Sequence, residues 1–285
     1  MARANLPRPC LMLVTEPMER SRLVDVVREA VAGGVNIVQL RDKTAKGPEL
    51  LDTAFALKEG IGDCPLLVNM RPTIASHADL AGVHLPGNGL RIDTVRAIIG
   101  PDRLIGRSIH GSSDPVAAGG DGADYLIVGT VFASRSHEDI FPAGTDAIRH
   151  VREALQQWFA SDLRTDPSNW GTELLFASGG RRVPPGCAGR VPFGCAGSFI
   201  DPARLDVISD SCLFVSARRD RRESKNPRAA NLPIIAIGGI TPENCEECLA
   251  AGASGVAVLS GILHAADPRA AARKYWERLI ACATG

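Results

Sequence analysis

The stretch LMLVTEPMERSRLVDVVREAVAGGVNIVQL, residues 11–40, contains the pattern that decides the fold. Leu11–Thr15 and Asn36–Leu40 are short β-rich runs. Between them, Ser21–Val31 carries apolar side chains at i, i+3 and i+4 spacing, which predicts an amphipathic helix. Gly33-Gly34 supplies the stop signal for that helix. The stretch is therefore a strand, a helix and a second strand.

The same alternation continues along the chain. We count eight β-rich runs, each followed by a helix or a helical turn. Nearly continuous apolar runs such as Leu126–Val128 are typical of parallel strands buried on both faces. Eight such units predict an α/β fold, a closed TIM (β/α)8 barrel. A doubly wound open sheet is the alternative, but no G-x-G-x-x-G motif follows the first strand. The remaining runs are Leu66–Asn69, Gly82–Leu85, Leu104–Ile109, Tyr125–Val131, Pro233–Ile237 and Gly255–Leu259.

One long segment breaks the alternation. From Phe159 to Asn231 the periodicity fades, and the segment holds a tandem repeat over 182–197 and a charged run, Arg218–Lys225. A loop between a helix and a strand in such folds usually has ~2–6 residues. Proline, glycine and mixed charge over this length favour a flexible insertion. We therefore predict a single barrel over residues 1–285, interrupted by an insertion at 159–231 between the sixth helix and the seventh strand.

Composition excludes several classes of partner. Lys+Arg and Asp+Glu are both 32, so the formal net charge is zero and gives no electrostatic reason to expect nucleic acid or an acidic membrane surface. No run approaches the ~20 apolar residues that span a bilayer, and residues 1–9 lack the apolar core of a signal peptide. We expect a cytoplasmic protein with mostly reduced thiols, and the sequence leaves a homo-oligomer open. Cys245 and Cys248 fall in a predicted helix, so we do not expect zinc there.

In this architecture, functional groups lie at the carboxyl ends of the strands. Here those ends are rich in donors and cations and poor in carboxylates, which favours an anionic ligand and no metal. Gly238-Gly239 precede a helix that we expect to open at Thr241-Pro242, and Ser260-Gly261 follow the next strand. This arrangement predicts a phosphate site built from backbone N–H groups. The alternative is that these glycines only terminate strands.

Other strand ends supply charge and an acid–base group. Arg41 and Lys43, spaced i, i+2, would neutralise a phosphate, diphosphate or carboxylate, unless they form a salt-bridged rim. His110 closes the fifth strand and can exchange a proton near neutral pH, with His84 and His137 as rival bases. The segment 134–137 (SRSH) would wrap an anion, or is a solvated loop.

Several motifs at these strand ends resemble those of the thiamine phosphate synthase/TenI family. They are QLRDK (39–43), GVHL (82–85), IGRSIH (105–110), GADY (122–125), GTVF (129–132), AIGGI (236–240) and GVAVLSG (255–261). The resemblance implies a TIM barrel of thiamine biosynthesis that takes a small phosphorylated thiazole and, for one of two activities, a pyrimidine. The substrate-binding residues that follow are Gln39, Arg41, Lys43, Asn69, Ser108, Ser134, Ser136, His137, Gly238, Gly239, Leu259, Ser260 and Gly261.

The family has two branches. The synthase joins a pyrimidine diphosphate to a thiazole phosphate with Mg²⁺, and its pattern has carboxylates where this chain has Met70 and Gly89. Neither side chain offers the oxygen ligands that Mg²⁺ requires. The sequence therefore favours the thiazole tautomerase (TenI-type) branch, without a cofactor and with His110 as general acid and base. The synthase with Mg²⁺ is the first alternative, and a non-catalytic phosphate-binding regulatory barrel is the second.

Overall fold

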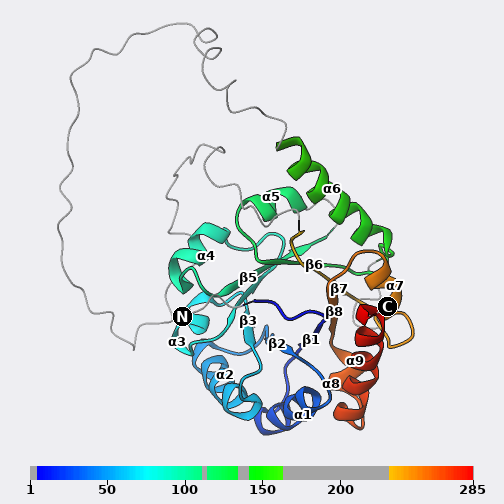
Figure 1. Ribbon diagram of the computed structural model, residues 1–285. Helices are drawn as coiled ribbons and strands as arrows, with labels where there is room; N and C mark the ends of the chain where they lie inside the picture. The colour runs from blue at the N-terminus through cyan, green and yellow to red at the C-terminus, as the bar shows by residue number, and fades with distance from the viewer. Residues whose placement is uncertain (1–4, 111–113, 134–140, 163–230, 285) are drawn as a thin grey trace, which may run out of the picture. The chain divides into compact units, whose positions relative to one another are not determined.

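A computed structural model describes residues 5–110, 114–133, 141–162 and 231–284. Eight parallel strands close into a barrel in chain order, so that β8 pairs with β1 (Figure 1). The predicted TIM (β/α)8 barrel is confirmed, and the strand bounds lie close to those predicted. The strands are β1 (Cys10–Val14), β2 (Ile37–Leu40), β3 (Leu66–Asn69), β4 (Gly82–Leu85), β5 (Leu104–Ile109), β6 (Tyr125–Val128), β7 (Ile234–Ile237) and β8 (Gly255–Val258).

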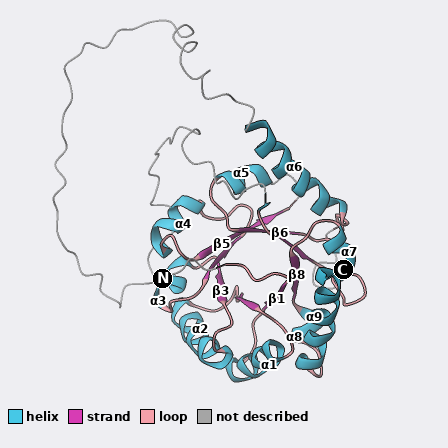
Figure 2. Cartoon of the chain, in the orientation of Figure 1, coloured by secondary structure: helices cyan, strands magenta, loops and turns pink. Residues whose placement is uncertain are grey.

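Helices surround the strands (Figure 2). Those between successive strands are α1 (Arg20–Ala32), α2 (Gly47–Ile61), α3 (Pro72–His77), α4 (Ile92–Ile99), α5 (Pro115–Gly120), α6 (Asp146–Asp162) and α7 (Cys245–Ala250). Two helices follow β8, the short α8 (Ser260–Leu263) and α9 (Pro268–Thr284). The sequence pattern predicted α9, but α8 is too short to show a helical period. No helix in the described ranges is long and apolar enough to cross a bilayer.

Each strand separates two apolar layers, which explains the continuous apolar runs. Along β1, Leu11 and Leu13 belong to the cluster between sheet and helices, whereas Met12 and Val14 belong to the cluster inside the barrel. This alternation is the period of two that a pleated strand imposes. The interior layer also contains Ile37, Leu67, Leu104, Tyr125, Ile127, Ile235 and Ala257.

The boundary of the predicted insertion needs one correction. The helix before it, α6, continues to Asp162 instead of ending at Phe159. Residues 163–230 lie outside the described residues, and with them the tandem repeat and the charged run. The flexibility of this segment and the single-domain organisation stay predictions.

One ion pair joins three elements at the amino ends of the strands. Asp124 Oδ2, just before β6, accepts a hydrogen bond from Arg96 Nη2 of α4 at 2.6 Å and one from Ile105 N of β5 at 2.8 Å. Arg96 also donates to the carbonyl oxygens of Gly122 and Arg103. The Asp124 side chain is 8% exposed, so water screens the pair weakly.

We expect Asp124→Ala to lower the free energy of unfolding by about 3 kcal/mol, because Arg96 would lose its buried counter-ion. Urea unfolding followed by far-ultraviolet circular dichroism measures the change. Asp146→Ala is the matched control, because it breaks an exposed pair with Arg149 and should cost about 0.5 kcal/mol or less. Equal losses in the two variants would contradict a structural role for the Arg96–Asp124 pair.

Candidate active site

Four neighbouring strands place polar side chains inside the carboxyl end of the barrel, called the mouth below. Gln39 of β2 donates from Nε2 to Asn69 Oδ1 of β3 at 3.3 Å. His84 Nε2 of β4 and Ser108 Oγ of β5 lie 2.8 Å apart. Asn69 and His84 are partners in the strand register, so the two pairs are adjacent. The structure thus brings together Gln39, Asn69 and Ser108 from the predicted substrate-binding set.

His84 is unsuited to act as a base. Its side chain is 3% exposed, and its second ring nitrogen, Nδ1, lies 3.2 Å from Tyr125 Oη. Burial, and then the charges of Arg107 and His110, lower the pKa of His84 to about 3. The ring therefore stays neutral with both nitrogens engaged. The sequence did not mark Tyr125, because a tyrosine in an apolar strand has the pattern of a core residue.

His110 has the opposite character. It follows β5, it is exposed, and its Nδ1 lies 2.6 Å from the carbonyl oxygen of Gly129. A carbonyl oxygen only accepts, so Nδ1 must carry the hydrogen that it donates. The remaining nitrogen, Nε2, then holds the lone pair of the neutral ring. This geometry suits proton exchange through Nε2.

The predicted cationic rim lies where β2 ends. The backbone N–H of Arg41 donates to Thr15 Oγ1 at 2.9 Å, which fixes the chain as it leaves the strand. Arg41 is half-buried and Lys43 is exposed. Within the described ranges neither side chain forms an ion pair, which argues against a salt-bridged rim there. Among the described residues, no carboxylate neutralises either charge, which fits the predicted role of both in binding an anion.

Two glycines shape the opposite side of the mouth. Gly238 and Gly239 have φ values of 100° and 63°, a region that L side chains rarely adopt. A Cβ at Gly239 would collide with the carbonyl oxygens of Ala133 and Phe132, so the loops after β6 and β7 touch through backbone. Glycine is therefore required at both positions by the backbone conformation and the close contact, whether or not an anion binds there. Leu259 and Ser260 stand at the start of α8, with Gly261 one residue further.

The helix after Gly239 begins later than predicted. Thr241–Asn244 form a turn in which Asn244 Oδ1 accepts from Thr241 N at 2.8 Å, and α7 starts only at Cys245. The structure therefore places Asn244, not Thr241, at the N-cap. Asn244 Nδ2 also donates to the Gly239 carbonyl oxygen at 3.0 Å, which holds the glycine loop in place.

Two described carboxylates near the strand ends already have hydrogen-bond partners within the protein. Asp42 Oδ1 accepts from Thr44 N, Thr44 Oγ1 and Ala45 N at 2.8–2.9 Å. Burial opposes ionisation of Asp42, but these hydrogen bonds outweigh it and lower its pKa. Glu16, after β1, lies 2.7 Å from His264 Nε2, an ion pair that the sequence did not reveal.

The residues that the structure describes at the mouth do not fit a Mg²⁺ ion. Met70, where the resembling synthases have a carboxylate, is 49% exposed and has a φ of 63°. Left-handed backbone costs a non-glycine residue ~1–2 kcal/mol, less for Asp or Asn. No group of three His, Cys, Asp or Glu side chains in the described ranges could hold a metal ion. The predicted substrate-binding residues Ser134, Ser136 and His137 lie outside the described residues.

The family model and the curated relatives indicate one family. The model described as thiamine monophosphate synthase (TMP-TENI) matches residues 11–161 and 223–262. A thiamine-phosphate synthase of Methanoculleus marisnigri is 30% identical over 95% of this chain and 95% of the relative. One of Natronomonas pharaonis is 31% identical over 88% and 84%. The solved thiamine phosphate pyrophosphorylase of Pyrococcus furiosus shares the fold, with a TM-score of 0.62 and 23% identity over 98% and 99% of the two chains.

We expect Gly239→Ala to lower the free energy of unfolding by about 2–4 kcal/mol, because the new Cβ meets backbone oxygens as well as an unfavourable φ. Gly252→Ala is the control, since Gly252 has a φ of 100° but no atom within 3.6 Å of the added Cβ, the nearest being Arg152 Cγ at 3.7 Å. That variant should lose about 1 kcal/mol. Urea denaturation compares them, and equal losses would show that the loops are not tightly packed.

Proposed function

Because the chain belongs to the thiamine monophosphate synthase family, we propose that it acts as a thiamine-phosphate synthase, joining a pyrimidine diphosphate to a thiazole phosphate. The observation that supports this reaction is the name shared by relatives that align with nearly the whole chain. Those names favour the joining reaction over the isomerisation that the motifs favoured. Thiamine biosynthesis is common to both.

The residues at the mouth suit two phosphorylated substrates. In this proposal, backbone N–H groups near Gly238, Gly239 and Ser260 bind the thiazole phosphate. Arg41 and Lys43 bind the diphosphate and stabilise the negative charge that it carries away as the leaving group. The amides of Gln39 and Asn69 orient the rings. No residue of the described ranges is assigned to Mg²⁺, because the side chains there do not fit it.

One observation favours a second candidate, the thiazole tautomerase. The residue after Asn69 is Met70, which carries a thioether and not a carboxylate. His110 contacts the backbone through Nδ1, so this contact does not occupy Nε2. Such a site could remove a proton from a carboxythiazole phosphate and return it elsewhere on the ring. A single base can serve both steps, and formation of the aromatic ring supplies the driving force.

The deciding experiment incubates the full chain with each substrate set, with Mg²⁺ and with a chelator, and follows products by chromatography. Thiamine phosphate formed from the two synthase substrates supports the first proposal. Aromatic thiazole formed in the presence of chelator supports the second. If neither substrate set is turned over, both proposed reactions are contradicted. The remaining reading is then a non-catalytic phosphate-binding regulatory barrel.

If the tautomerase reaction is observed, His110→Ala should lower kcat by about 10²–10⁴-fold, because Nε2 is the proposed acid and base. His77→Ala is the matched control. His77 also directs Nδ1 at a backbone oxygen, that of Thr73 at 2.7 Å, but it lies on α3. Its kcat should match that of the unsubstituted chain. An unchanged rate in His110→Ala would remove His110 from the mechanism.

A further inference from the structure

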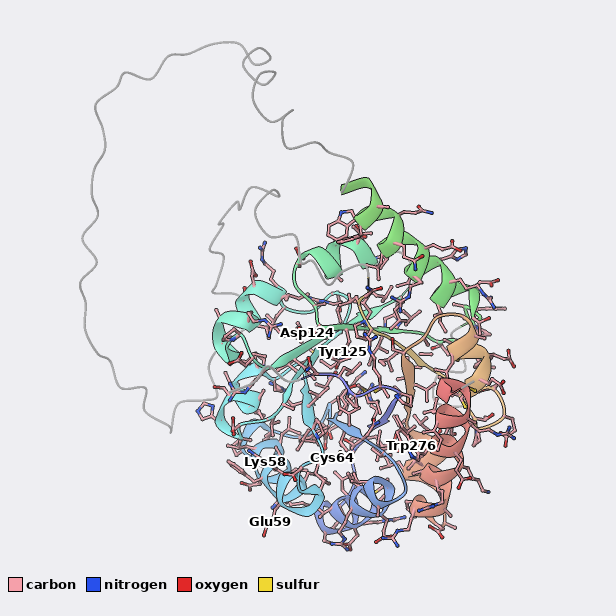
Figure 3. All side chains as sticks on the ribbon, in the orientation of Figure 1. Lys58, Glu59, Cys64, Asp124, Tyr125 and Trp276 are labelled. Atoms are coloured by element: carbon pink, nitrogen blue, oxygen red, sulfur yellow. The ribbon has the colours of Figure 1, made fainter. Side chains whose placement is uncertain are left out.

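A polar chain of three residues crosses the barrel interior below the mouth. Tyr125 Oη lies 3.2 Å from His84 Nδ1, and His84 Nε2 lies 2.8 Å from Ser108 Oγ. The Tyr125 and His84 side chains are 0% and 3% exposed, and Ser108 is 9% exposed at the outer end. Figure 3 shows Tyr125 toward the middle of the ring of strands, whereas Trp276 lies in the surrounding helical layer.

A glycine makes this arrangement possible. Gly106 of β5 is the register partner of His84 on one side and of Tyr125 on the other. A Cβ at Gly106 would collide with the Cζ and Oη atoms of Tyr125. Because Gly106 has no side chain, the phenol of Tyr125 on β6 can cross β5 and reach the imidazole of His84 on β4.

The direction of the hydrogen bonds follows from the donors and acceptors available. The only hydrogen-bond partner of Tyr125 Oη in the described part of the chain is His84 Nδ1. Burial raises the pKa of Tyr125, so the phenol keeps its hydrogen and must donate it. The ring nitrogen Nδ1 then accepts. The reverse direction would leave the buried O–H group without an acceptor, which folded proteins avoid.

The second half of the chain is then fixed. The neutral His84 ring, whose Nδ1 accepts, carries its hydrogen on Nε2 and donates it to Ser108 Oγ. A serine hydroxyl that accepts this bond still has its own hydrogen to donate. Since Ser108 is the outermost member, that hydrogen is available at the mouth.

We propose that Tyr125, His84 and Ser108 form a hydrogen-bond relay of fixed direction, which makes Ser108 Oγ a hydrogen-bond donor to an acceptor atom on the heterocycle of the substrate. His84 is a positioning residue in this relay. Ser108 bonds His84, the register partner of Asn69, and the amides of Gln39 and Asn69 are the groups assigned to the rings. We therefore assign Ser108 to the ring end of the ligand. The identity of that ligand rests on the proposed function, but the direction of the relay does not.

Nitrogen NMR of the labelled full chain tests the direction without any substrate. The His84 signals, assigned by their loss in His84→Gln, should show a protonated Nε2 and an unprotonated Nδ1 from about pH 5 to about pH 8. His77 is the internal reference for the opposite tautomer, because its Nδ1 faces a carbonyl oxygen. Tyr125→Phe should mix the two tautomers of His84. Tyr275→Phe, which removes a buried phenol bonded to the Ile240 oxygen, should leave the His84 signals unchanged. A hydrogen on His84 Nδ1 would overturn the relay.

A double-mutant cycle tests the donor role. Calorimetric titration with thiazole phosphate should show Kd raised about 10-fold in Ser108→Ala, which loses the hydrogen bond to the ligand. In Tyr125→Phe, Kd should rise about 3-fold, because that bond is only weakened. In the double variant, Kd should match that of Ser108→Ala, because Tyr125 can affect the ligand only through the serine hydroxyl. If the rise in Kd of the double variant equals the product of the two single rises, Tyr125 acts independently of Ser108. That result would overturn the donor role. Failure of the unsubstituted chain to bind thiazole phosphate would count against the proposed function, while the NMR result would still decide the relay.

Discussion

The closed ring of parallel strands imposes one constraint from which the rest of the structure follows. Every strand is covered on both faces, and along each strand every second side chain points into the barrel interior, which is largely apolar. A polar group placed there must find its partner on a neighbouring strand. Gln39 pairs with Asn69 and His84 pairs with Ser108 for this reason, and every buried side-chain nitrogen and oxygen in the described residues is hydrogen-bonded. The same requirement that stabilises the interior orders the polar surface offered to a ligand.

The sequence predicts this barrel well, because strands covered on both faces leave long apolar runs and helices leave a period of 3.6. Gly82–Leu85 and Leu104–Ile109 match the observed strands in full. Side-chain partnerships are harder to predict, because they depend on register between strands distant in sequence. The bond between Tyr125 and His84 depends on Gly106 lying between them, which no local pattern shows. The late start of α7 is equally hard to predict, because the turn over Thr241–Asn244 is closed by a bond from Thr241 N to Asn244 Oδ1 that the Thr-Pro signal does not show.

The features that identify the family and the side chains that would determine the reaction lie in different parts of the molecule. The match to the thiamine monophosphate synthase family extends over most of the barrel, where strand and helix patterns dominate. In the proposals above, the choice between joining two rings and rearranging one depends on a few side chains after β3 and β5. The Met70 side chain supplies no oxygen donor there, and His110 keeps Nε2 free of the Gly129 contact. A scaffold that separates stability from chemistry can keep its identity while these few positions change.

The backbone at Met70 has a further consequence. The left-handed conformation is held by the bond from Met70 N to the His84 oxygen at 2.9 Å, so it belongs to the sheet and not to the methionine side chain. Asparagine, aspartate and glycine all adopt this conformation more readily than methionine does. A single substitution could therefore introduce an oxygen donor at position 70 without moving a strand. Because the backbone already has the conformation that such residues favour, this position can exchange a thioether for an oxygen donor while the barrel stays the same.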